Sequence, residues 1–198
     1  MNLPVILFII YLIEFIALAI NPYDREVWFA ENLPIVIIVA ILVLTYKKFR
    51  FSNLAYVMMS FLIFMHTVGG HYTFERVPFD LVNDFFGFER NNYDRFAHFS
   101  VGFYAYAIAE FLDRKKLTNA SWLLYLFPVT AIFTVASVYE IIEWITAATI
   151  DPEAGMAFLG VQGDVWDAQK DMLMDATGAV TAVFLYWLVR KKAKYLNP

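Results

Sequence analysis

The chain has 198 residues, of which 61% are hydrophobic and 17% are charged, and its mean hydropathy is +0.57. Soluble domains are about 45–50% apolar, so this composition indicates one integral membrane domain over residues 1–198. The formal charge of −4 argues against a nucleic-acid partner, and the lack of cysteine excludes disulfides, thiolate metal sites and cysteine nucleophiles.

Six apolar segments predict an all-α polytopic bundle with six transmembrane helices. In chain order they cover residues 3–20, 33–46, 53–72, 94–112, 121–150 and 167–189. No basic residue precedes the first segment and Glu14 lies inside it, so we interpret it as a retained helix rather than a signal peptide. The second segment is short for a span, with Asn32 as its expected N-cap and Pro34 in its first turn. Flanking polar residues are expected to extend it, or the bilayer to thin around it.

Two long connections, residues 73–93 and 151–166, separate the later spans. The first is rich in phenylalanine, which is typical of a segment on the membrane interface. Ten basic residues cluster at the span ends near 47–50, 114–116 and 190–194, whereas the opposite ends carry five. The positive-inside rule therefore predicts that both termini are cytoplasmic and that the two long connections face outward, into the periplasm of a bacterium.

With this topology, polar residues of four spans are expected at one depth near the outer surface. The members of this polar layer are His66, His71, Asp94, His98, Glu140, Glu143, Asp171 and Asp175. A charge at the centre of a membrane costs roughly 2.5–3.5 kcal/mol on insertion scales, so four such spans indicate a shared pocket. Three pairs lie on one helix face each, at i,i+4 or i,i+3 spacing: Asp94 and His98, Glu140 and Glu143, and Asp171 and Asp175.

An offset of 77 residues relates part of this layer to the rest. It connects His66 with Glu143, Asp94 with Asp171, and His98 with Asp175. The third and fourth spans could thus be a parallel repeat of the fifth and sixth, or the hairpins could merely share a length. In the last segment, Asp164 and Asp167 are expected at the solvated rim. A small-residue face for close helix packing follows them, formed by Ala176, Gly178, Ala179 and Ala182.

Three interpretations of the polar layer remain open. In the first, it holds zinc or a similar divalent metal, because imidazole and carboxylate groups suit such ions. The expected ligands are His66, His71, His98, Asp94 and Asp175, and the expected acid/base groups are Glu140, Glu143 and Asp171. In the second, no metal is bound: the layer relays protons, or Arg95 and Lys170 bind a phosphate or carboxylate head group. In the third, the groups only satisfy one another, for example His98 with Asp171.

Four motifs carry a family resemblance: HTVGGHYT at 66–73, YDRFAHF at 93–99, YEIIEW at 139–144 and QGDVWDAQKDM at 162–172. As a set they resemble the YjdF-type family of predicted bacterial inner-membrane proteins. The resemblance covers nearly the whole chain and implies a multi-pass inner-membrane protein, without implying a particular activity. A weaker similarity to the VanZ-like membrane proteins rests on Asp94, His98, Glu143, Asp171, Asp175 and Gly178, where Asp175 stands in place of their usual asparagine.

The leading functional hypothesis is a membrane-embedded hydrolase or transferase that acts on a lipid or a phosphorylated head group at the periplasmic face. The first alternative is an ion, proton or metal carrier. A carrier needs a path to the cytoplasm, and the inner halves of the spans are nearly featureless apart from Glu110. The second alternative is a non-catalytic partner of another membrane protein. In each case the lipid bilayer is the expected environment.

Overall fold

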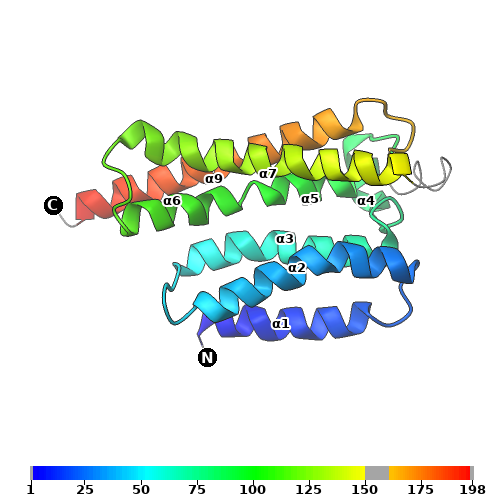
Figure 1. Cartoon of the computed structure of the whole chain (residues 1–198), viewed down its shortest axis with the longest axis horizontal. Coiled ribbons are helices and arrows are strands. Elements are labelled where there is room, and N and C mark those ends of the chain that lie inside the picture. The colour runs from blue at the N-terminus through cyan, green and yellow to red at the C-terminus, as the bar shows by residue number, and fades with distance from the viewer. Residues whose placement is uncertain (1, 150–160, 197–198) are drawn as a thin grey trace.

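The computed structural model describes residues 2–149 and 161–196, which form eight helices and no strand. The helices are α1 (Leu3–Leu18), α2 (Arg25–Thr45), α3 (Asn53–Tyr72), α4 (Asp80–Phe86), α5 (Tyr93–Val101), α6 (Tyr104–Arg114), α7 (Ser121–Thr149) and α9 (Asp167–Leu196). Figure 1 shows α1, α2 and α3 in one half of the bundle and α5, α6, α7 and α9 in the other. The α3 helix joins the halves because it packs on α5 and α6 as well as on α1 and α2.

Four helices are long and apolar enough to cross a membrane by themselves: α2, α3, α7 and α9 as far as Lys192. The α1 helix is apolar but shorter, and α5 and α6 share one expected span. Large apolar side chains such as Ile13 and Leu44 are exposed on the outer faces, where a bilayer would cover them. The all-α membrane class is therefore confirmed, and the molecule contacts lipid over these faces.

The α2 helix begins at Arg25 rather than at residue 33. The side chain of Asp24 caps it by accepting hydrogen bonds of 2.8 and 3.0 Å from two backbone N–H groups of the first turn. Asn32, the expected N-cap, lies inside the helix and donates to the Trp28 carbonyl at 2.9 Å, so that expectation was wrong. The polar residues before Pro34 belong to the helix and bring it to 21 residues, which solves the problem of the short span.

The fourth expected span is broken at Gly102 and the residue after it, between α5 and α6. At this break Gly102 lies against α9, and a Cβ added to it would stand 2.2 Å from the backbone nitrogen of Ala179. A Cβ on Gly178 would stand 2.0 Å from the Phe99 carbonyl oxygen. Ala179 and Ala182 are fully buried, so the predicted small-residue face of α9 is confirmed as a close helix contact.

The phenylalanine-rich connection contains α4, a seven-residue helix at the end of the bundle where α3 ends and α5 begins (Figure 1). Leu81 and Phe85 of α4 are 89% and 81% exposed. Such exposed apolar side chains beside polar loop residues suit a helix on the membrane interface. The N-terminal end of α1 and the C-terminal end of α9 both lie toward the opposite end of the bundle, each in its own half (Figure 1).

Candidate functional site

A pocket of about 1260 Å³ between the two halves of the bundle is the candidate site. Residues of α2, α3, α5, α6, α7 and α9 line it. Seven members of the predicted polar layer do so: His66, Asp94, His98, Glu140, Glu143, Asp171 and Asp175. A large pocket that collects titratable groups from several helices is a candidate for a binding or catalytic site.

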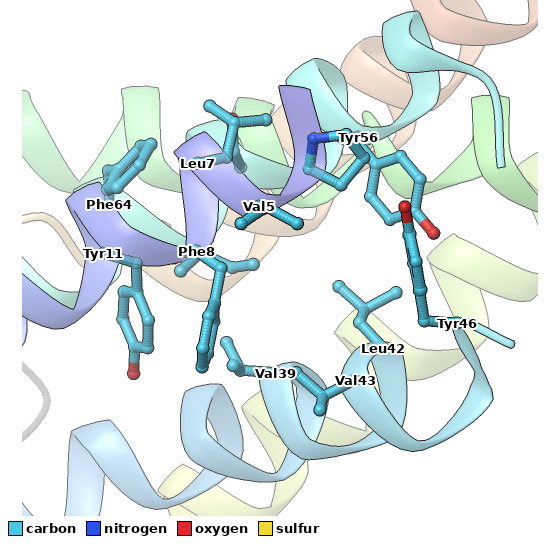
Figure 2. Close-up of a pocket in the computed structure, with 13 residues that line it drawn as sticks. Val5, Leu7, Phe8, Tyr11, Val39, Leu42, Val43, Tyr46, Tyr56 and Phe64 are labelled. Atoms are coloured by element: carbon cyan, nitrogen blue, oxygen red, sulfur yellow. The ribbon is translucent and has the colours of Figure 1, made fainter. Parts of the chain in front are cut away.

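A second pocket, of about 210 Å³, lies among α1, α2 and α3 and differs in character. Figure 2 shows its wall of apolar and aromatic side chains, among them Phe8 from α1 and Val39 and Leu42 from α2. None of the described residues that line it carries a carboxylate or an imidazole. It therefore offers none of the groups that the predicted chemistry needs.

His98 lies at the centre of the polar layer with carboxylates on both sides. Its Nδ1 is 3.1 Å from Asp175 Oδ2, and its Nε2 is 3.6 Å from Asp94 Oδ1 and 3.9 Å from Asp171 Oδ1. One ligand atom from each of Asp94, His98 and Asp171 lies within 4.8 Å of the others. Tetrahedral zinc with bonds of about 2.0–2.2 Å separates its ligand atoms by roughly 3.4 Å, so these three residues could hold a metal with little adjustment.

Asp175 lies behind His98 rather than beside the other two carboxylates. If His98 donates its Nδ1 proton to Asp175, the Nε2 lone pair faces Asp94 and Asp171, which is the arrangement that commonly orients a metal-binding histidine. Asp175 is 1% exposed, and its Oδ1 has no hydrogen-bond partner among the described residues. Asp171, expected as an acid/base group, faces Nε2 in the position of a ligand.

His66 belongs to a second polar group in the same pocket. Its Nε2 is 3.1 Å from Glu31 Oε2, and the Tyr139 hydroxyl donates to the same oxygen at 3.5 Å. Glu31 is 8% exposed and was missed from the sequence because it falls in the stretch that was expected to precede the span. The signal was present: a helix extended backward to the roughly 20 residues that a span needs would have included Glu31.

His71 is not brought to either group. Its Nδ1 lies 2.8 Å from the Leu18 carbonyl oxygen, so it links the end of α3 to the end of α1. It does not line the large pocket.

A cluster of charges lies at the rim of the pocket. We call it the rim cluster, and it consists of Arg90, Arg95, Asp164, Asp167 and Lys170. Arg90 Nη1 is 2.7 Å from Asp167 Oδ1, and Arg95 also pairs with Asp167. Asp167 was expected to be solvated but is 5% exposed, so that expectation was wrong. The two guanidinium groups take the place of water around its carboxylate.

The two residues expected to bind a head group are already engaged by the protein. Arg95 pairs with Asp171 as well as with Asp167, and Lys170 Nζ lies 2.6 Å from Asp164 Oδ2. The hydrogen bond from Lys170 holds the pKa of Asp164 below its usual value. Neither cation lines the pocket.

The 77-residue offset recurs in direct contacts between the helices. It separates the members of three pairs: Arg90 and Asp167, His98 and Asp175, and Asp113 and Arg190. The α5 and α6 helices therefore run beside α9 in the same direction and in constant register from the rim of the pocket to the opposite end of the bundle. This register is compatible with the parallel repeat that the sequence suggested.

Comparison with known proteins gives two matches. The family model described as "Predicted membrane protein (DUF2238)" matches residues 3–192. The inner membrane protein YjdF of Escherichia coli (strain K12) is 34% identical over 170 residues, which cover 83% of this chain and 79% of that protein. No solved structure matches the chain. The resemblance expected from the four motifs is confirmed.

Proposed function

The chain belongs to the DUF2238 family of predicted membrane proteins, and from that premise we propose that it is a metal-dependent hydrolase or transferase of the bacterial inner membrane. Its substrate would be a lipid or a phosphorylated head group that enters the large pocket from the periplasmic side. The similarity to an inner membrane protein of Escherichia coli supports the location.

The proposed topology is one membrane domain with six spans and both termini in the cytoplasm. Besides the four long helices, α1 forms one span, and α5 and α6 together form a broken one. Two observations support it: the first and last helices begin and end at the same end of the bundle, and basic residues concentrate there (Figure 1).

The observation that carries the proposal is the environment of His98. Its Nε2 faces Asp94 and Asp171, while Asp175 holds its other nitrogen. A divalent metal bound there would activate a water as a nucleophile at neutral pH and polarise a phosphoryl or carbonyl oxygen. Glu140 and Glu143, on α7, line the same pocket, and whichever of them the substrate leaves free would give and take protons.

Metal analysis of protein purified without chelator tests this proposal. We expect about one divalent ion per chain in the wild type and its loss in His98→Ala. Asp175→Asn should weaken metal affinity about 10–100-fold, because it removes the group that orients the ligand. His71→Ala is the matched control and should keep the metal. Wild-type protein without stoichiometric metal, or His98→Ala that keeps it, would refute the site.

A carrier function is the second candidate, favoured by the additional His66–Glu31 pair in the same pocket. Against it, Glu110 of the inner half is buried and accepts bonds of 2.8 and 2.6 Å from the backbone nitrogen and Oγ of Ser52, so it is a structural link rather than an exit. Ion flux into liposomes that contain the purified protein would support the carrier. A non-catalytic partner protein would instead tolerate apolar residues throughout the layer.

A further inference from the structure

The large pocket changes from polar to apolar as it enters the bundle. Below the layer of carboxylates and histidines it continues along a surface that we call the apolar groove, formed by Ile38, Leu62, Val101, Ile108, Ile132 and Val135. On α2 the change takes place between Glu31 and Ile38, and on α7 between Tyr139 and Ile132. Seven residues of helix rise about 10 Å, so the groove extends at least that far below the polar layer.

The apolar groove opens between α2 and α7 on the lateral surface of the bundle. These two helices are not among the closely packed pairs of the described chain, and a hydrogen bond from Tyr139 to Glu31 links them near the polar layer. Val135 lines the pocket and is nevertheless 62% exposed, and Ile37, beside Ile38, is exposed as well. The side opening therefore faces the hydrocarbon of the bilayer, where a lipid chain could enter without meeting water.

The polar part of the pocket is strongly acidic. Eleven carboxylates line the described pocket against one guanidinium, that of Arg76, and two imidazoles. Asp164, Asp167 and Asp171 are already paired with Arg90, Arg95 or Lys170, and the remaining eight carboxylates still exceed the cations. Glu140 Oε1 and Asp175 Oδ1 are buried and have no hydrogen-bond partner among the described residues. Buried oxygens of this kind normally have a donor, and a cationic N–H group is the donor that such a site attracts most strongly. A purely anionic head group would be repelled.

We propose that this pocket binds an amine-bearing phospholipid, with its hydrocarbon chain in the apolar groove and its ammonium group among Glu31, Glu140 and Glu143. This inference rests on the proposed function, for which it names the substrate class. In a phosphoethanolamine head group the phosphate is adjacent to the amine, so an ammonium held by these glutamates would bring the phosphate toward the His98 group.

Lipid binding to the full chain, measured by native mass spectrometry, tests the inference. The probes are phosphoethanolamine, phosphocholine and phosphoglycerol lipids with identical chains. The phosphoethanolamine lipid should bind roughly tenfold or more tightly than the phosphoglycerol lipid, because it adds charged hydrogen bonds. Glu31→Gln should reduce this preference while the chain still binds. Equal binding of the three lipids, or a preference for phosphoglycerol, would overturn the inference.

Matched variants of α2 test the groove. Ile38→Trp fills the apolar groove and should weaken lipid binding at least about tenfold. Val39→Trp adds the same bulk to the smaller pocket of Figure 2 and should leave binding unchanged. Val135→Trp fills the same groove from α7. It serves as a second variant in case Ile38→Trp does not fold. Unchanged binding in a folded groove variant contradicts the proposal.

Measurement of the bound metal in the same variants distinguishes a failure of this inference from a failure of the proposed function. Ile38→Trp is expected to keep its metal while it loses the lipid, because Ile38 lies about two turns below the polar layer. A metal-loaded wild type without lipid preference would overturn the inference alone. A lipid preference in a protein that never holds metal would overturn the metal-dependent activity alone.

Discussion

At the scale of single residues, Arg95 is a buried cation at the pocket end of the bundle. It is 8% exposed and pairs with Asp167 and Asp171, which are also buried. One guanidinium with five N–H donors can serve two carboxylates at once, which an ammonium on a flexible stem does less well. Arg95 therefore compensates the acidic side chains that the adjoining part of α9 brings into the bundle.

Replacement of Arg95 by methionine should destabilise the protein by about 3–5 kcal/mol, because the buried Asp171 loses its cation and Asp167 keeps only Arg90. Thermal and denaturant unfolding in detergent measures the effect. Lys170→Met is the control, since the Lys170 side chain is 53% exposed and its pair with Asp164 should contribute about 1 kcal/mol or less. Similar losses in the two variants would show that Arg95 is not the central cation of the rim cluster.

The residues of the polar layer were largely predictable, but their partners were not. Each histidine or carboxylate inside an apolar run is costly in a membrane, so Asp94, His98 and Asp175 stood out in the sequence. Which carboxylate contacts which histidine nitrogen depends on the rotation of the helices and on side-chain rotamers. The spacing of residues in the sequence predicts neither. His98 was paired with Asp171 in one interpretation, whereas its short contact is to Asp175. His71 faces a carbonyl that no local pattern indicated.

At the scale of elements, the sequence-based predictions were least accurate at the boundaries of the helices. The stretch before Pro34 is polar, and polarity suggested a loop, but the cap at Asp24 starts the helix there and buries Glu31 inside the bundle. The break at Gly102 lies in an apolar run where the glycine itself is a weak local signal, since a single glycine is tolerated inside a helix. It coincides with the contact between α5 and α9, which is a tertiary feature.

The contact at Gly178 should make an ordinarily favourable substitution harmful. Gly→Ala inside a helix normally stabilises it by about 0.8–1 kcal/mol. In Gly178→Ala the new methyl group would meet the Phe99 carbonyl, and overpacking of this kind costs about 1–3 kcal/mol. We expect a lower melting temperature in detergent and weaker metal binding, because the contact adjoins His98 and Asp175. Thr177→Ala, on the exposed face, is the control; a stabilised Gly178→Ala would contradict the close approach.

At the scale of the whole molecule, the two ends of the bundle differ. At one end Asp113 accepts from Arg190 Nε at 2.6 Å and from the Tyr186 hydroxyl at 2.7 Å, which ties α6 to α9. At the other end the large pocket lies between α2 and α7, and a link between the two helices there is the 3.5 Å bond from Tyr139 to Glu31. A bundle that is tied at one end and hollow at the other would admit a ligand from one side of the membrane, and the charge distribution predicts that this side is the periplasm.

Cysteine labelling in intact cells tests that orientation directly. The chain has no cysteine, so each introduced thiol gives the only signal. Glu89 is exposed in the loop between α4 and α5 at the pocket end, and Asn119 is exposed in the loop between α6 and α7 at the tied end. A membrane-impermeant maleimide should label Glu89→Cys in intact cells and Asn119→Cys only after the inner membrane is permeabilised. The reverse pattern would place the pocket in the cytoplasm, and the proposed lipid would then come from the inner leaflet. Labelling of both sites in intact cells would show that the chain does not cross the membrane as six spans.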